Sequence, residues 1–390
     1  MLALIALGEV LGMTLWFSAT AAAPAIAADY RMDVGARAWL TMAVQAGFVA
    51  GTLVTALTNL ADAINARRLF GAGCVLGALF NASIAIAPSS AVIITLRFCT
   101  GMSLAWVYPP GMKIAAGWFL ERRGTALGIV VGAVGLGSSV PHLLAWAGAG
   151  LPWRVLVGAS SALAIAAAVI VGATVVDGPY VSASAPFDRH ALRVVLRSRG
   201  TRLAMLGYFG HMWELYAMWT WMAAFASTSL ASCMSAAGAS RTGSLIAFVT
   251  LAAGAAGCVI AGRWADEWGK ARVAGAAMVA SAACALASPL IFGASPSLLF
   301  LLAVVWGFTV VADSAQFSAL VTDYTPRTHV GTALTLQTSA GFLLTMISMR
   351  LVPPMSAIAG WRWAFVFLAP GPLFGALAMR SMRDREQRTV

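Results

Sequence analysis

Charged residues are scarce in this sequence: Asp, Glu, Lys and Arg make up 10% of its 390 residues, against roughly 25% in ordinary soluble domains. Hydrophobic residues make up 60%, and the mean hydropathy is +0.84. A soluble core cannot bury that much apolar surface, whereas a bundle of membrane helices can. The composition therefore predicts an integral, multi-pass membrane protein and excludes an ordinary soluble domain.

Several chemical signatures are also missing. The five cysteines are scattered without a CxxC pair, which argues against a disulfide framework, a zinc site or any other resident metal. There is no Walker A, H-E-x-x-H or G-x-S-x-G pattern, so neither ATP hydrolysis nor an intramembrane enzyme is indicated. The net charge of +11 accompanies no basic patch on a soluble domain, and basic residues instead mark cytoplasmic loops. We expect no cofactor and no nucleic-acid partner.

Apolar runs of about twenty residues, the length that spans a bilayer, follow one another along the chain. Short polar or Pro/Gly-rich turns separate them. This pattern predicts about twelve transmembrane helices. The predicted spans are 1–27, 38–60, 69–88, 91–118, 124–147, 153–176, 203–228, 242–262, 272–293, 297–321, 330–352 and 361–380.

The positions of the basic residues predict the orientation of these helices. With both termini in the cytoplasm, most of the 25 Lys and Arg residues fall in cytoplasmic segments, as expected in a bacterial inner membrane. No positive segment precedes the first run and Glu9 interrupts it, so this run is predicted to be a retained helix rather than a signal peptide. A longer polar segment, 177–202, separates six helices from six. Its latter part fits either an amphipathic surface helix or a solvated linker.

The two halves of the chain repeat each other. "EVLGMTLW" at Glu9 returns as "ELYAMWTW" at Glu214, and "GTAL" at Gly124 returns at Gly331. These repeats predict two homologous six-helix bundles, residues 1–176 and 203–390, with the substrate held between them near the membrane midplane. Arg202 precedes the seventh helix, and the position that corresponds to it in the first half would fall before Met1. The repeat therefore also predicts that the true start of the protein lies upstream.

The loop "GRWADEWGK" after the eighth predicted helix resembles a signature of the major facilitator superfamily, G-x-x-x-D-x-x-G-[RK]. The first-half copy, "TNLADAINARR", keeps part of it. The resemblance implies that both loops act in gating. The residues that match are Asp62, Arg67, Arg68, Gly262, Asp266, Gly269 and Lys270.

Two further patterns are similar to the same superfamily. Arg97 begins "RFCTG", like the fourth-helix R-x-x-x-G motif that is often tied to proton coupling. The fifth helix carries repeated glycines before Pro141, which let helices pack closely. The resemblance covers nearly the whole chain, and within the superfamily it leans towards the bacterial group labelled nitrate/nitrite- or cyanate-transporter-like. It implies a monomeric, proton-coupled secondary transporter that moves a small polar or charged solute by alternating access.

Buried polar groups are the candidates for substrate and proton sites. On a helix, positions i, i+3, i+4 and i+7 share a face, so His211, Glu214, Met218 and Trp221 are predicted to form one stripe. An acidic residue at the bilayer centre costs about 3 kcal/mol and is therefore kept for a partner or a function. We expect Glu214 and its repeat Glu9 to face the central cavity, although a structural hydrogen bond would also explain each of them. The other candidates are Asp313, Arg97, Met13, Trp16, Tyr108, Gln316 and Gln337.

Two alternative functions keep the same fold. His211 and the neighbouring methionines would suit a soft metal cargo such as Cu(I), because imidazole and thioether groups bind it. A transport-inactive membrane sensor is the other alternative, although the chain has no appended soluble domain that would support it.

Overall fold

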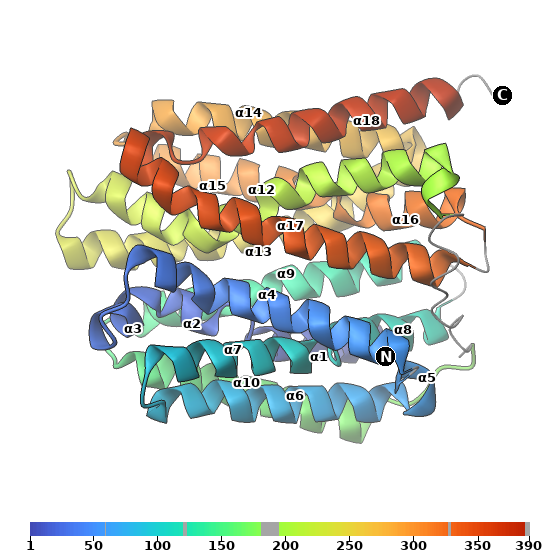
Figure 1. Ribbon diagram of the computed structural model, residues 1–390, viewed down its shortest axis with the longest axis horizontal. Helices are drawn as coiled ribbons and strands as arrows, with labels where there is room; N and C mark the ends of the chain where they lie inside the picture. The colour runs from blue at the N-terminus through green and yellow to red at the C-terminus, as the bar shows by residue number, and fades with distance from the viewer. Residues whose placement is uncertain (59, 120–122, 181–194, 327–328, 387–390) are drawn as a thin grey trace.

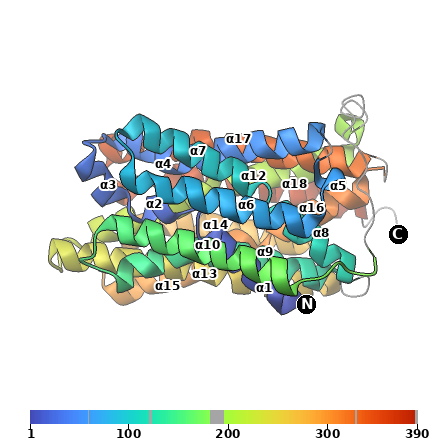
Figure 2. The same ribbon diagram turned by 90° about the horizontal axis from the view of Figure 1, so that it is seen from below.

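A computed structural model describes the protein except at residues 59, 120–122, 181–194, 327–328 and 387–390 (Figure 1). Every regular element in this described part is a helix, and the long helices run along one common axis (Figures 1 and 2). Ten segments among the described residues are long and apolar enough to cross a membrane. The first helix, which is broken, and α12 complete the bundle. The predicted all-α membrane fold is confirmed.

The described part of the first half contains ten α-helices, several of which are pieces of one membrane segment. They are α1 (Leu2–Met13), α2 (Ser18–Ala21), α3 (Ala23–Asp29), α4 (Val34–Leu57), α5 (Leu60–Ala63), α6 (Ala66–Ser83) with the 3-10 turn η1 (Ile84–Ile86), α7 (Ser90–Leu104), α8 (Tyr108–Trp118), α9 (Arg123–Ala147) and α10 (Trp153–Thr174).

The second half follows the same plan. Its helices are α12 (Arg199–Leu230), α13 (Ala236–Trp268), α14 (Lys270–Ile291), α15 (Pro296–Ala312), α16 (Ser314–Tyr324), α17 (Val330–Ala359) and α18 (Pro370–Glu386), with the 3-10 turns η3 (Trp361–Trp363) and η4 (Val366–Leu368) before the last.

Polar caps and one glycine explain where several helices begin. The side chains of Asp33, Ser89 and Ser235 accept hydrogen bonds from the first turns of α4, α7 and α13, which satisfies donors that a helix start leaves free. Gly269 joins α13 to α14 with a φ of 89°, a conformation that side-chain-bearing residues avoid.

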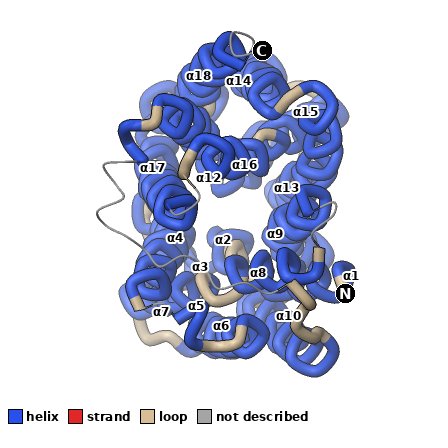
Figure 3. The backbone as a smooth tube through the Cα atoms, turned by 90° about the vertical axis from the view of Figure 1, so that its right-hand side faces the viewer, coloured by secondary structure: helices blue, strands red, loops and turns tan. Residues whose placement is uncertain are grey.

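The helices pack as two bundles, seen end-on in Figure 3. Within each bundle, α1 packs on α9 and α10, and α12 packs on α13, α17 and α18. The main contacts between bundles are α9 with α13 and α4 with α17. An added Cβ at Gly132 of α9 would lie 3.2 Å from the carbonyl oxygen of Ala255 on α13. The predicted role of the fifth-helix glycines in close packing is thus confirmed at this position.

One pair of glycines in each half allows the same close contact between two helix backbones. A Cβ at Gly47 of α4 would collide with the backbone of α7, and one at Gly101 of α7 would collide with the backbone of α4. Gly257 of α13 and Gly307 of α15 face each other's backbone in the same way. Small residues allow such backbone-to-backbone approach, and its repetition shows that the internal sequence repeat extends to helix packing.

Three predicted membrane helices are interrupted within the described residues, and the predicted span 361–380 begins with the 3-10 turns η3 and η4 before it continues as α18. The predicted break is confirmed between α7 and α8 at residues 105–107, and Pro109 and Pro110, which lack backbone donors, lie just after it in the first turn of α8. Breaks at Thr14–Phe17 in the first helix and at Asp313 in the tenth were not predicted. In addition, α12 begins at Arg199, inside the range predicted as linker, because Ser198 caps its first turn at Thr201. Most of the predicted amphipathic segment lies outside the described residues.

The start of α1 and the end of α18 lie at the same end of the bundle (Figure 1). At this end, Arg67 Nε pairs with Asp177 Oδ1 at 3.0 Å. Hydrogen bonding from Arg67 is the main reason that the pKa of Asp177 lies below its ordinary value. Because the folded-state pKa is depressed, this pair stabilises the fold above the unfolded-state value near 3.9 and loses its effect as the pH falls through the folded value.

Candidate site between the two halves

The break in the first helix places two aromatic side chains between the bundles. After α1 ends at Met13, residues 14–17 form a turn, and Trp16 and Phe17 project from it. Trp16 is 1% exposed and Phe17 is 0% exposed. A helix interrupted at depth is tolerated only where protein groups satisfy its freed carbonyls.

Arg97 of α7 supplies those groups. Its guanidinium donates to the carbonyl oxygen of Leu15 at 2.9 Å and to that of Trp16. It also donates to Leu40 O of α4 and to Asn81 Oδ1 of α6. A cation near the carboxyl end of α1 is also favoured by the helix dipole. Arg97, predicted as a substrate or proton group, therefore has its donors committed to holding the break.

Six rings meet at the interface, and we call them the central aromatic cluster. Trp16 lies 5.1 Å from Phe48 and 5.6 Å from Phe342 between ring centroids. The other pairs across the interface are 5.0 to 6.3 Å apart. The first half contributes Trp16, Phe17 and Phe48, and the second half contributes Tyr216, Trp219 and Phe342.

Several polar atoms around this cluster have no hydrogen-bond partner among the described residues. Three are N–H donors: Trp16 Nε1, Trp219 Nε1 and Gln45 Nε2. The Gln45 oxygen is used, since it accepts from Thr345 Oγ1 of α17 at 2.6 Å. The amide of Gln337, one of the predicted cavity residues, is also buried and unpartnered. Buried donors without acceptors are costly, so this interface is suited to a ligand that carries acceptors.

Glu214 does not face this interface. Its carboxylate accepts from Ser281 Oγ of α14 at 2.7 Å and from Trp306 Nε1 of α15 at 2.8 Å. Both partners lie inside the second bundle. The predicted stripe therefore points the other way from the interface, and Trp221 follows it, with its indole donating to Met349 O at 3.1 Å. The predicted direction of this helical face was therefore wrong.

Glu9 lies inside the first bundle in the related position. A Cβ on Gly111 of α8 would collide with its carboxylate, and a Cβ on Gly12 one turn further along α1 would lie 3.1 Å from Cys74 Sγ of α6. Neither oxygen of Glu9 has a hydrogen-bond donor in the described part of the chain, and the residue is 0% exposed. A buried carboxylate without donors costs free energy, so Glu9 needs a proton or a partner from another conformation.

Asp313 and His211 form a buried pair. Nδ1 of His211 lies 2.8 Å from Oδ1 of Asp313, and both side chains are 2 to 3% exposed. The other ring nitrogen of His211 lies 3.0 Å from Ser314 Oγ. Asp313 stands at the break between α15 and α16. The structure thus brings together two residues that the sequence suggested separately.

A sequence comparison identifies the family. The profile described as "Major Facilitator Superfamily" matches residues 5–240 and 204–389. This chain belongs to the Major Facilitator Superfamily. It is therefore an integral membrane protein of a transporter family that moves small solutes, and not an enzyme. The nucleoside transporter NupG has the same fold, with a TM-score of 0.73 and 15% identity over 98% of this chain and 99% of its own.

Two curated transporters of Escherichia coli (strain K12) resemble part of this superfamily member. The 3-(3-hydroxy-phenyl)propionate transporter is 29% identical over 134 residues, which is 34% of this chain and 33% of that protein. The hexuronate transporter is 27% identical over 152 residues, which is 38% of this chain and 34% of that protein. The match thus spans about a third of either relative.

The loops expected to act in gating have different surroundings in the two halves of this superfamily member. Lys270 Nζ pairs with Asp323 Oδ2 at 2.5 Å, near the end of α16, whereas Arg67 pairs with Asp177. Gly269 forms the turn described above, and Gly262 and Asp266 lie within α13. The side chain of Asp62 lies outside the described residues, and Arg68 is exposed.

The other predicted cavity residues divide between core and interface. Met13 and Met218 are fully packed core residues, and Gln316 Nε2 of α16 donates to Ala312 O at the end of α15. Tyr108 begins α8 and packs against the core. Sequence reasoning missed Phe17, Phe48, Tyr216, Trp219, Phe342 and Gln45. Tyr216 and Trp219 lie two and five residues after Glu214, on another face of α12 than the stripe that the sequence grouped.

Proposed function

We propose that this chain is a secondary active transporter for a small organic acid with an apolar or aromatic body. The central aromatic cluster carries this proposal, because it offers ring faces from both halves beside three N–H donors that lack acceptors in the described structure. Rings stack on apolar or aromatic groups, and the donors suit carboxylate or hydroxyl oxygens. The names of the two partly similar relatives, a hexuronate and a hydroxyphenylpropionate transporter, fit the same chemical class.

Alternating access is the proposed mechanism, with residues 1–176 and 203–390 rocking about the cluster. Away from the termini, Arg241 Nε of α13 donates to Trp146 O of α9 at 3.2 Å, and Arg350 of α17 lies against Gly35 of α4. These contacts close that end. The opposite end carries Arg68, Lys270 and other cations, so the positive-inside rule supports cytoplasmic termini in a cytoplasmic membrane. Opening would exchange one set of contacts for another.

Protons are the proposed driving ions, and the Asp313–His211 pair is the proposed carrier in the second half. The pair is buried at a helix break, where a small rearrangement would change its access to water. Ionisable groups inside membrane bundles typically serve ion pathways. Glu9, whose oxygens meet no donor in the part of the chain that the structure describes, is the counterpart in the first half. Glu214 is less suited, because two donors already hold its oxygens.

The test uses purified protein in proteoliposomes that contain a pH-sensitive dye. Hexuronate, 3-(3-hydroxyphenyl)propionate, a nucleoside, an amino acid, nitrate, cyanate and Cu(I) would each be added outside at equal concentration. We expect an organic acid to move protons and to be accumulated. If only a nucleoside, an inorganic anion or copper does so, the proposed substrate class is wrong. If no solute crosses while the protein remains folded, the sensor alternative is favoured.

Copper is the weaker cargo on structural grounds. Both ring nitrogens of His211 already have partners, Asp313 and Ser314. Binding a soft metal there would require breaking one of these contacts, and Met218 packs in the core.

Trp219→Phe is expected to weaken substrate binding while keeping the ring. Losing one N–H donor costs about 1 kcal/mol, which raises KM roughly fivefold. The measurement is initial uptake across a range of substrate concentrations. Trp264→Phe is the matched control, because Trp264 is exposed on α13 and stacks on Trp268. Equal KM values for Trp219→Phe and wild type would remove this indole from the site.

Asp313→Asn is expected to abolish proton-driven accumulation and to leave substrate exchange intact. Neutralising an obligatory proton carrier inside the membrane should reduce accumulation about tenfold or more, whereas exchange down a substrate gradient needs no net proton transfer. Uptake driven by a pH gradient is compared with counterflow in the same vesicles.

Two other variants serve as controls for this experiment. Asp323→Asn makes the same substitution at the exposed pair with Lys270 and should keep coupling. Glu214→Gln should also keep coupling, because its role is to join α12 to α14 and α15. Loss of coupling in Glu214→Gln but not in Asp313→Asn would move the proton site to Glu214.

A further inference from the structure

Two grooves on the outer surface of the protein are built from equivalent residues of the two halves. One lies between α14 and α18, the other between α6 and α10, and each has a volume of about 640 Å³. Residues of α6 correspond to residues of α14 that lie 204 positions later, and residues of α10 correspond to residues of α18 that lie 208 positions later. The matching pairs are Arg68 and Arg272, Gly71 and Gly275, Ala72 and Ala276, Val75 and Val279, Ile165 and Leu373, Ala168 and Ala376, Val169 and Leu377, and Gly172 and Arg380.

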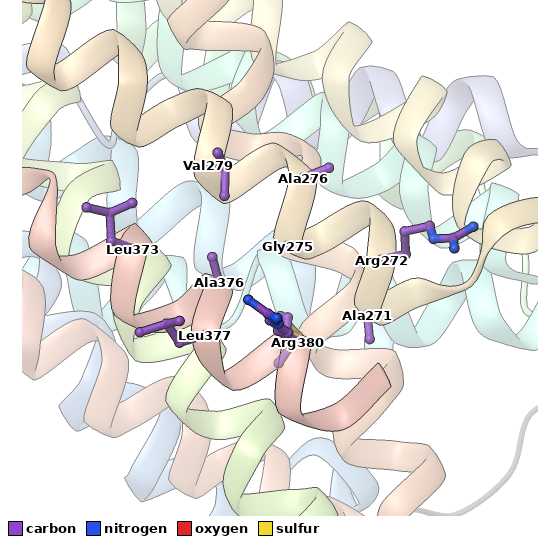
Figure 4. Close-up of a pocket in the computed structure, with 10 residues that line it drawn as sticks. Ala271, Arg272, Gly275, Ala276, Val279, Leu373, Ala376, Leu377 and Arg380 are labelled. Carbon is purple, nitrogen blue, oxygen red and sulfur yellow. The ribbon is translucent and has the colours of Figure 1, made fainter. Parts of the chain in front are cut away.

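The α14–α18 groove, which we call the basic groove, is apolar along its length and cationic at one end (Figure 4). Val279, Leu373 and Leu377 are 41 to 61% exposed, so they face lipid in a membrane. On α14, Arg272 lies seven residues from Val279, and on α18, Arg380 lies seven residues from Leu373. Seven residues correspond to a rise of about 10 Å along a helix. In Figure 4, Arg380 lies between the two helices and Arg272 projects from α14.

The charges at this end are available for a ligand. Arg272 and Arg380 are both exposed, and neither makes a hydrogen bond or ion pair with the residues whose side chains the structure describes. The groove on the other half differs in two ways: Gly172 replaces the second arginine, and Arg67 is already paired with Asp177. Of the described cations that line that groove, only Arg68 has no partner. The asymmetry predicts that the basic groove holds an anion more tightly.

We propose that the basic groove binds an anionic diacyl phospholipid from the leaflet at the termini end, with its phosphate at Arg272 and Arg380 and an acyl chain along Gly275, Ala276 and Ala376. Guanidinium groups bind phosphate in a geometry that forms paired hydrogen bonds. Basic pockets between membrane helices on the cytoplasmic side are suited to anionic head groups. Small side chains give the groove its depth, and the exposed valine and leucines flank the chain.

Native mass spectrometry of the full-length protein in detergent tests this proposal. Phosphatidylglycerol and phosphatidylcholine with identical acyl chains would be titrated separately. We expect the wild-type protein to bind phosphatidylglycerol at least fivefold more tightly than phosphatidylcholine. The double variant Arg272→Gln/Arg380→Gln should lose this preference, and Arg68→Gln should reduce total binding by less. Ala276→Phe, which fills the groove but keeps both arginines, should also lose the tight site.

The matched control is Arg197→Gln/Arg199→Gln, which removes two exposed charges from the same end of the molecule. It should bind phosphatidylglycerol like wild type. Equal losses in both double variants would mean that only the general surface charge attracts the lipid, and the proposal would be overturned. Soluble glycerol 3-phosphate should not compete. Full competition by it would identify a simple anion site instead, as would unchanged binding in Ala276→Phe.

Discussion

Arg97→Lys is expected to lower the thermal unfolding temperature by about 5–10 °C and to impair transport at the same time. Arg97 donates to two carbonyls of the break in the first helix, to Leu40 O and to Asn81. An ammonium group on a flexible stem cannot reach all of these acceptors. Each buried acceptor left without a donor costs about 1–3 kcal/mol, and a loss of 1 kcal/mol lowers the midpoint by roughly 2–4 °C in a domain of 150–250 residues.

Transport should fall because the break also positions the central aromatic cluster. Trp16 accepts one of the Arg97 bonds through its own carbonyl oxygen, so a displaced break moves its ring. The measurement is unfolding of the purified protein in detergent, together with KM in proteoliposomes. Arg154→Lys is the control, since Arg154 pairs with Asp29 with about half of its side chain exposed. An exposed pair contributes no more than about 1 kcal/mol. Similar shifts for the two variants would show that Arg97 does not hold the break.

Gly101→Ala is expected to lower the yield of folded protein strongly. The added methyl group would occupy the position of the Val44 carbonyl oxygen. Helices α4 and α7 would have to separate, and overpacking of this kind costs about 1–3 kcal/mol or more. Gly307→Ala should cause a comparable loss, because Gly307 meets the carbonyl of Thr250 in the same way.

Gly158→Ala provides the matched control for the glycine variants. Gly158 is exposed on α10, and a Cβ there would meet nothing within 4 Å. Alanine favours a helix over glycine by about 1 kcal/mol, so this variant should be neutral or slightly stabilising. The readout is the fraction of protein that elutes as a single species on size exclusion, followed by thermal unfolding. A wild-type profile for Gly101→Ala would mean that α4 and α7 are further apart than described.

The sequence predicted the fold well because the membrane imposes a simple rule. In lipid, each backbone donor and acceptor must be satisfied inside the protein, so apolar runs of sufficient length become helices. The predicted spans match the described helices to within several residues at most ends, and the proline pair at Pro109 was enough to predict the break between α7 and α8. The breaks at Thr14–Phe17 and at Asp313 carry no such residue, and tertiary contacts, such as those of Arg97, hold the first of them.

The candidate site was predicted less well, and Glu214 illustrates the reason. The spacing of His211, Glu214, Met218 and Trp221 grouped residues along α12, but periodicity does not say which neighbour a face meets. Ser281 and Trp306, 67 and 92 residues away, supply the hydrogen bonds that turn Glu214 into the second bundle. Trp16, in contrast, does lie between the halves, because α1 ends at Met13 and Trp16 projects from the turn that follows.

By itself the sequence determined the membrane environment, the number of helices, the internal repeat and the family. These follow from local composition and spacing, which act within one helix or between equal positions of two halves. The tertiary structure alone decided that Asp313 meets His211, that Glu9 has no donor among the described residues and that the rings of both halves form one cluster. It also decided which arginines are already engaged and which, among the described side chains, have no partner at the basic groove. Each of these depends on the rotation and depth of one helix against another, and packing between distant segments sets those two quantities.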